Sequence, residues 1–238
     1  GSGKSVTLYA ALQTLHRDYP FLAIQTLDDP LEYIVGDWLH QSQINVDVGA
    51  GFNDLMRFIL RTDPDAAMLG EMRDEETAKM AVKFALSGHR LLSTLHADNS
   101  IAVISRMQEL HVNLGTLSQT FKASIAQRLT AEPCMDCAKE IPANSETLSY
   151  GGNIDDTYLV CKGCTNCKER GSKKRFPVQE FCLIENDIEA DMVKRNDTVG
   201  LRAAMNNKGL FSLDKKIWDL AKNHKIPLKE AMKLTGKK

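Results

Sequence analysis

Gly1-Ser2-Gly3-Lys4-Ser5 opens the chain and holds the residue types of a phosphate-binding loop. In the pattern G-x-x-x-x-G-K-[ST], the second glycine lets the backbone approach the phosphates, the lysine reaches the β and γ phosphates, and the serine hydroxyl can bind Mg²⁺. Gly3, Lys4 and Ser5 match this second half, whereas the first glycine and two spacer residues would precede Gly1. A match of five residues is short, and Gly-Ser can also be left by an expression vector.

Three short apolar strands are predicted, and each ends in acidic or histidine side chains. They cover residues 21–27, 65–70 and 89–96. In an open α/β sheet the ligand binds beyond the carboxyl ends of the strands, where these side chains would meet. Glu71 follows the second strand, and a carboxylate there can orient or deprotonate the water that attacks a γ phosphate. His96 ends the third strand near Asp98, although a lone histidine is more often structural than catalytic.

Other charged side chains have two interpretations each. Asp28 and Asp29, with Glu32 shortly after them, follow the first strand where acids would face a ligand, but Asp-Asp-Pro also favours a solvated turn. Arg57 and Arg61 are four residues apart on one side of a predicted helix, so both could reach one anion. A solvated position is, however, the commoner fate of a surface arginine.

Helical patterns alternate with these strands. Apolar residues at positions 8, 11, 12 and 15 predict a helix directly after Ser5, with its N-terminus aimed at the phosphate. Further helices are predicted over residues 52–62, 74–88, 100–110 and 117–128. From Glu185 onward the pattern is again helical and includes residues 217–221 and 228–234. Strands that alternate with helices indicate an α/β fold.

Four cysteines occur in two C-x-x-C pairs, Cys134 with Cys137 and Cys164 with Cys167. This spacing favours a metal in a reducing compartment over disulfides, and two such pairs can supply the four thiolates of a tetrahedral Zn²⁺ site. Because closed coordination leaves no open position, we expect a folding role. Cys161 lies three residues before Cys164 and leaves the second pair ambiguous; buried thiols without metal are the alternative. Cys182 is predicted to be a core residue on a strand.

The composition is that of an ordinary globular protein. The chain has 238 residues, of which 43% are hydrophobic and 26% charged, and its formal net charge is −1. Neither this balance nor the basic run within residues 168–175, which lacks interleaved aromatic residues, indicates nucleic-acid binding. No apolar run approaches the roughly 18 residues that a transmembrane segment needs. The polar, glycine-rich residues 144–157 are predicted to form a surface loop.

Four ordered motifs carry a resemblance to a known family. They are Gly1-Ser2-Gly3-Lys4-Ser5, Thr26-Leu27-Asp28-Asp29-Pro30-Leu31-Glu32-Tyr33, Leu60-Arg61-Thr62-Asp63-Pro64-Asp65 running into Gly70-Glu71-Met72-Arg73-Asp74, and Ser93-Thr94-Leu95-His96-Ala97-Asp98. This set resembles the Walker A, Asp box, Walker B and His box of the secretion ATPases that drive type II secretion and type IV pilus assembly. The resemblance covers residues 1–182 well and the remainder loosely.

The resemblance implies a RecA-like P-loop ATPase core with an incomplete start of the Walker A loop, a tetracysteine zinc knuckle and a helical C-terminal tail. We expect these regions over residues 1–130, 131–180 and 181–238. Gly163-Cys164-Thr165-Asn166-Cys167 resembles the second knuckle of the family, so Cys164 and Cys167 are preferred over Cys161 as zinc ligands beside Cys134 and Cys137. The knuckle favours assembly or secretion motors over retraction motors.

The resemblance also implies roles for the motif residues. Residues 1–5 would bind nucleotide phosphate, with Ser5 on Mg²⁺. Asp29 and Glu32 would form the acidic box at the nucleotide, Glu71 would activate water, and His96 would sense or position the γ phosphate. The arginines that could contact phosphate or a neighbouring subunit are Arg57, Arg61 and Arg73. The family usually has Glu-Asp-Pro where this chain has Asp28-Asp29-Pro30, which shortens the reach of residue 28 by one methylene.

The implied function is ATP hydrolysis that powers assembly of a type IV pilus or a type II secretion pseudopilus. The motor would be a homo-oligomeric ring, hexameric by family analogy. It would lie in the cytoplasm, peripheral to the inner membrane and docked on membrane platform proteins. Its cofactors would be ATP, Mg²⁺ and Zn²⁺, with no nucleic-acid partner.

Two other functions remain open at this stage. A nucleoside kinase also combines a phosphate loop with a four-cysteine zinc site, but it would not require His96 or the run from Asp-Pro-Asp to Glu71 as a unit. A binding or interaction module is a third interpretation, because the phosphate loop lacks its first residues. For the same reason we expect weak or absent nucleotide binding by this chain alone.

Overall fold

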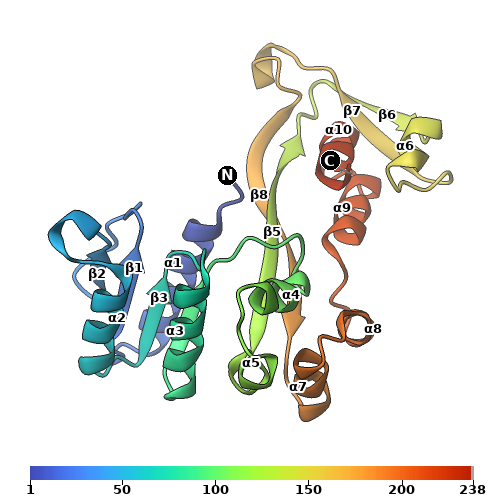
Figure 1. Ribbon diagram of the computed structural model, residues 1–238. Helices are drawn as coiled ribbons and strands as arrows, with labels where there is room; N and C mark the ends of the chain where they lie inside the picture. The colour runs from blue at the N-terminus through green and yellow to red at the C-terminus, as the bar shows by residue number, and fades with distance from the viewer. Residues whose placement is uncertain (237–238) are drawn as a thin grey trace. The chain divides into compact units, whose positions relative to one another are not determined.

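The computed structural model describes residues 1–236, which form two compact units (Figure 1). The core unit comprises Lys4–Ser124 and Cys182–Ala204. The cysteine unit comprises residues 1–3, 125–181 and 205–236. None of the helices in the described part of the chain is both long and apolar enough to cross a membrane.

The core unit contains a parallel sheet of four strands in the order β2-β1-β3-β4. The strands are β1 (Ile24–Asp28), β2 (His40–Gln43), β3 (Ala66–Leu69) and β4 (Arg90–Ser93). Every residue of β3 is buried. A continuous apolar run of this kind is typical of a central parallel strand that is covered on both faces.

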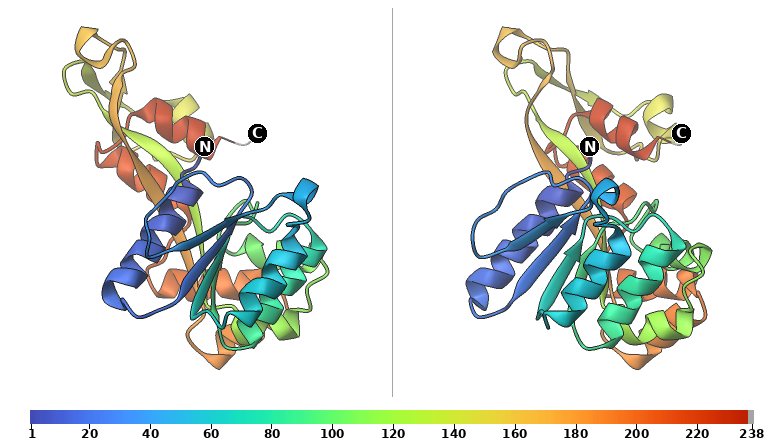
Figure 2. Two further views of the ribbon diagram at one scale, coloured as in Figure 1. Left: turned by 90° about the vertical axis from the view of Figure 1, so that its left-hand side faces the viewer. Right: turned by 60° about the vertical axis from the view of Figure 1, so that its left-hand side comes forward.

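Helices cover both faces of this sheet, as Figure 2 shows. On one face, α1 (Lys4–Asp18) packs Leu12 against Ile24 and Met68. On the other face, α2 (Phe52–Arg61) and α3 (Glu75–Leu86) pack against Ala67 and Leu69. Because side chains alternate along a strand, neighbouring residues of β3 serve opposite layers. The helices predicted over residues 52–62 and 74–88 are thus confirmed, as is the helix after Ser5.

The rest of the core unit is helical. It contains α4 (Ala102–Glu109), α5 (Leu114–Thr120), α7 (Asp187–Lys194) and most of α8 (Thr198–Asn207). Asparagine side chains cap two of these helices, because Asn113 accepts from the Thr116 N–H and Asn186 accepts from the Glu189 N–H. Each cap satisfies a backbone donor that the first turn leaves without a partner.

The cysteine unit contains two pairs of strands and two packed helices. β5 (Ala123–Pro133) pairs with β8 (Ser172–Leu183), and β6 (Ala138–Pro142) runs antiparallel to β7 (Thr157–Cys161). Against these strands pack α9 (Leu213–Lys222) and α10 (Leu228–Thr235), with Tyr158, Ile217 and Ala231 in a shared core. The short elements are α6 (Ser145–Ser149) and the 3₁₀ turn Thr165–Cys167 here, and the 3₁₀ turn Val46–Val48 in the core unit.

Two local predictions are wrong. The helix predicted over residues 117–128 ends at Thr120, because Phe121 is extended and the chain enters β5 at Ala123. Pairing with β8, which lies about fifty residues later in the chain, outweighs the local helical spacing there. The loop predicted over residues 144–157 contains α6, whose Thr147 is buried under an Asn144 cap. Cys182 is buried on β8, as predicted.

Candidate functional site

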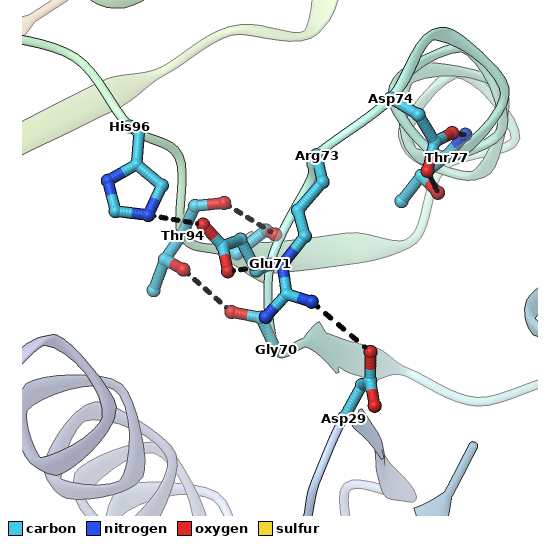
Figure 3. Close-up of polar contacts among 9 residues, drawn as sticks. Asp29, Gly70, Glu71, Arg73, Asp74, Thr77, Thr94 and His96 are labelled. Atoms are coloured by element: carbon cyan, nitrogen blue, oxygen red, sulfur yellow. Dashed lines mark hydrogen bonds and ion pairs between the residues drawn. The ribbon is translucent and has the colours of Figure 1, made fainter. Parts of the chain in front are cut away.

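Glu71 lies at the centre of a charged cluster just beyond β3 (Figure 3). Its Oε2 is 2.7 Å from Nε of Arg73, and its Oε1 is 2.7 Å from Nε2 of His96. The Glu71 side chain is only 18% exposed, whereas those of Arg73 and His96 are 61% and 78% exposed. The carboxylate is therefore anchored in the protein and meets basic groups that reach it from solvent.

Thr94 connects the segments that follow β3 and β4. Its Oγ1 donates to the Gly70 carbonyl at 2.7 Å, and its own carbonyl accepts from the Met72 N–H at 2.9 Å. The backbone bond continues the contact between the two segments after β3 and β4 end, and the side-chain bond adds a second link. They bring His96, two residues after Thr94, within reach of Glu71.

Arg73 connects Glu71 to the end of β1. Its Nη1 lies 3.4 Å from Oδ2 of Asp29, the exposed residue that directly follows this strand. Partial burial opposes ionisation of Glu71, but Arg73, His96 and Lys4 together outweigh it and lower the pKa of the carboxyl. Glu71 is therefore ionised at neutral pH, in the state that a general base requires.

Asp28 has its hydrogen-bond partners on β1 and α1. It is 5% exposed, and its Oδ2 accepts a hydrogen bond of 2.7 Å from Thr26 Oγ1. Burial raises the pKa of Asp28, although the hydrogen bonds from Thr26 and Tyr9 oppose this shift. The Tyr9 hydroxyl also accepts from Gln41 Nε2 at 3.2 Å. Asp28 thus belongs to a polar network between α1 and the sheet.

The remaining predicted nucleotide ligands and arginines occupy separate positions. Lys4 and Ser5 form the first turn of α1, and Lys4 is close enough to Glu71 to lower its pKa. Glu32 is exposed after β1 and acts on Asp28 through its charge. Arg57 lies on α2 with Nη1 3.9 Å from Oδ1 of Asp54, and Arg61 is exposed in the last turn of that helix.

The four cysteines of the two C-x-x-C pairs come together in the cysteine unit. The Sγ atoms of Cys134, Cys137, Cys164 and Cys167 all lie within 4.8 Å of one another. Cys164 Sγ is 3.8 Å from that of Cys134 and 3.7 Å from that of Cys167. Tetrahedral Zn²⁺ with Zn–S bonds of about 2.3 Å separates its sulfurs by about 3.8 Å. The sulfurs therefore have the spacing of a zinc site.

Backbone groups support this cluster. Cys167 Sγ accepts from the N–H groups of Cys164 and Gly171, each at 3.2 Å. Burial opposes ionisation of the Cys167 thiol, but these two donors help to lower its pKa to about 7. Gly171 has a φ of +70°, and a Cβ there would lie 2.5 Å from the Cys161 carbonyl oxygen. Cys161 lies beside the cluster, and its thiol interacts with the Cys137 side chain and the Cys134 backbone.

Comparison with known proteins gives the family. A model of the type II/IV secretion system protein family matches residues 1–233. The chain belongs to this family. A type II secretion system protein E from Pectobacterium carotovorum subsp. carotovorum is 38% identical over 198 residues, which is 83% of this chain and 39% of the relative. The type IV pilus assembly ATPase PilB of Thermus thermophilus is 32% identical over 218 residues, 90% of this chain and 24% of the relative.

The chain thus spans about two fifths or less of the length of these curated relatives. Two solved structures share the α/β fold. The pilus retraction motor PilT with bound ADP matches with a TM-score of 0.67 and 23% identity, over 100% of this chain and 59% of that one. The ATPase DotB of Yersinia pseudotuberculosis matches with a TM-score of 0.69 and 20% identity, over 99% of this chain and 55% of that one. At these identities the likeness concerns the fold alone.

Several residues that shape the site were not predicted from the sequence. Thr94 precedes His96 within the Ser-Thr-Leu-His motif, but nothing local shows that it bonds Gly70. Tyr9 and Gln41 reach the Asp28 network from α1 and β2, so their role depends on tertiary packing. The only signal for Thr94 in the sequence is its place in the Ser-Thr-Leu-His motif. The residue that its hydroxyl bonds, Gly70, lies 24 residues earlier in the chain.

Proposed function

We propose that the protein containing this chain hydrolyses ATP on a RecA-like core, with Glu71 as the residue that orients and deprotonates water. The observation that carries this proposal is the ionised Glu71 at the carboxyl end of β3, held by Arg73 and His96 near Lys4. Lys4 and the loop before it would bind the phosphates, and Ser5 would bind Mg²⁺. The family match does not favour a nucleoside kinase.

Both oxygens of Glu71 already have basic neighbours in this geometry. Arg73 also contacts Asp29, so one guanidinium joins the two acidic motifs. Because a γ phosphate carries negative charge, it would compete with Glu71 for Arg73 and His96 and would free a carboxylate oxygen for water. His96 would then position the phosphate, while Asp29 and Glu32 would contribute the acidic box beside the nucleotide.

The test is steady-state ATP hydrolysis by the intact protein with Glu71→Gln. This variant keeps the shape of the side chain but cannot accept the proton, so we expect kcat to fall by about 10²- to 10⁴-fold. Glu109→Gln is the matched control, because Glu109 is 63% exposed and pairs with Arg106 on α4. Turnover within twofold of wild type in Glu71→Gln would refute the proposed role.

We propose further that this hydrolysis powers assembly of a type IV pilus or a type II secretion pseudopilus at the cytoplasmic face of the inner membrane. Support comes from the family and from relatives named for type II secretion and type IV pilus assembly. The motor would be a hexameric ring docked on membrane platform proteins, with Arg57 and Arg61 offered to a neighbouring subunit. Loss of secretion or pili in cells that carry only Glu71→Gln, with normal protein levels, is the expected result.

We also propose that the cysteine cluster holds one structural Zn²⁺. Support comes from the sulfur spacing and from the N–H donors aimed at Cys167. Zinc would crosslink the segments before β6 and after β7 and would stabilise the fold without an open coordination position. Protein purified without chelator should contain one zinc per chain. Cys164→Ser should lose it and Cys161→Ser should retain it; equal zinc contents in these two variants would contradict the ligand set.

A further inference from the structure

Gln127, on β5, joins the phosphate loop to β8 through its side-chain amide. Its Nε2 donates to the Ser2 carbonyl oxygen at 2.7 Å. Its Oε1 accepts from Nε2 of Gln179, also at 2.7 Å. Because Gln179 offers a donor to the oxygen, the amide of Gln127 is held with its nitrogen toward Ser2. All three residues belong to the cysteine unit.

This contact fixes the direction of one peptide group in the loop. In a planar trans peptide the carbonyl and the following N–H point in opposite directions. With the Ser2 carbonyl held toward Gln127, the Gly3 N–H points away from Gln127. In phosphate loops it is the backbone N–H groups that surround the bound phosphate. The Gly3 N–H is thus held on the side of the peptide away from Gln127, where it can meet a phosphate.

Gly3 is adapted to the same contact. Its φ is +79°, a conformation that glycine adopts without strain. A Cβ at this position would lie 3.1 Å from Nε2 of Gln127 and 3.6 Å from a methyl carbon of Leu129. The loop backbone therefore lies close to β5, and a Cβ at Gly3 would crowd the Gln127 amide. The close approach and the hydrogen bond act on the same peptide.

We propose that Gln127 is a positioning residue for the phosphate loop and that Gln179 orients it. The proposal deepens the proposed ATPase function and rests on it. Gln127 touches the loop backbone rather than the reacting atoms, so it sets the binding of the phosphates and not the attack of water. Gln179 is itself tied to α9, because its carbonyl accepts from Nζ of Lys216 at 2.8 Å. Helix α9 thus contacts the residue that orients Gln127.

The experiment compares Gln127→Met with wild type in the intact protein. Methionine has a similar length but offers no N–H, so the Ser2 carbonyl loses its donor and the peptide is free to rotate. We expect the KM for ATP to rise about five- to tenfold, as for the loss of one ordering hydrogen bond. The Kd for ADP should rise by the same factor, and kcat should stay within about twofold, because the lost interaction is equal in ground and transition states.

Gln179→Met removes only the orienting partner and should raise the KM about two- to threefold with the Gln127 amide still present. It also tests the proposal if Gln127→Met folds poorly. Gln13→Met is the matched control, because Gln13 is exposed on α1 and its replacement should leave both constants unchanged. Thermal unfolding midpoints of all variants should agree within about 4 °C.

The outcomes separate this proposal from the function on which it rests. A merely structural role of Gln127 would lower the active fraction, and with it kcat, while the KM stays at the wild-type value; that result would overturn the proposal. A wild-type KM in both Gln127→Met and Gln179→Met would do the same. If Lys4→Ala abolishes hydrolysis in the same assay, the ATPase site stands, and either of these two results refutes only the role of Gln127. Wild-type hydrolysis by Lys4→Ala would instead refute the ATPase site.

Discussion

Replacement of Gly171 by alanine should weaken the proposed zinc site by distorting its backbone support. Gly171 donates its N–H to Cys167 Sγ at 3.2 Å, and its carbonyl accepts from the Cys134 N–H at 3.1 Å. It therefore contacts one cysteine of each C-x-x-C pair. A Cβ at this position would lie 2.5 Å from the Cys161 carbonyl oxygen, a distance that no packed structure tolerates without movement of the backbone.

The magnitude has two parts. The φ of +70° costs an alanine about 1–2 kcal/mol, because its Cβ crowds the following carbonyl. The collision with Cys161 adds about 1–3 kcal/mol, the usual cost of overpacking a filled site. Only the collision with Cys161 moves the Gly171 backbone away from Cys134 and Cys167, so only its cost affects zinc binding. At 1.4 kcal/mol for each factor of ten, a central value of about 2 kcal/mol corresponds to about 30-fold weaker zinc binding.

Gly209→Ala provides the matched control in the same unit. Its φ is +73°, so it carries the same left-handed strain, but within residues 1–236 no heavy atom beyond its own chain neighbours lies within 4 Å of its Cβ position. Zinc affinity is measured by competition with a chromogenic chelator, and stability by urea unfolding of the zinc-loaded protein. Gly209→Ala should lower stability by about 1–2 kcal/mol and keep wild-type zinc affinity. If Gly171→Ala binds zinc as tightly as Gly209→Ala, the argument from backbone support is wrong.

Three further predictions concern the core unit. Asp28→Asn should become more stable than wild type as pH rises. Because the folded-state pKa of Asp28 is raised, wild type loses stability as pH increases from the unfolded-state pKa to the folded-state pKa, and the variant does not. Urea unfolding across pH 4–8 measures the difference, and a difference that does not change with pH would contradict the prediction. Arg73→Gln removes a group that lowers the Glu71 pKa, so the acidic limb of the kcat/KM profile should move to higher pH; an unmoved limb would contradict this. Phe84→Ala, at a fully buried position, should cost about 3–5 kcal/mol of unfolding free energy, whereas Phe21→Ala, 98% exposed, should change it little.

The elements that could be predicted are those whose signal is local. The spacing of Leu8, Leu12 and Leu15 predicts α1, and the run of apolar residues in β3 predicts a buried strand. Acids at Glu75 and Glu76 mark the start of α3 through their interaction with the helix dipole. In each case the residues that predict the helix or strand lie within that element and a few residues of one another.

The elements that could not be predicted depend on distant partners. β2 has the sequence His-Gln-Ser-Gln and offers no apolar pattern, because it is an edge strand held by backbone pairing with β1. β5 carries a helical spacing but becomes a strand when β8 pairs with it. The chain also returns to each of the two units after leaving it, which local patterns do not encode.

Asp28 and Asp29 show how one residue of register decides a chemical role that composition leaves open. Ile24 and Thr26 precede Asp28 at alternate positions on β1, and Ile24 packs with α1, so strand alternation directs Asp28 toward the same layer. Asp29 is the first residue after the strand and faces Arg73 instead. Asp28 therefore belongs to the buried network under α1, where its carboxylate accepts a hydrogen bond from Thr26. Asp29 is the acid that contacts the Glu71 cluster, through Arg73.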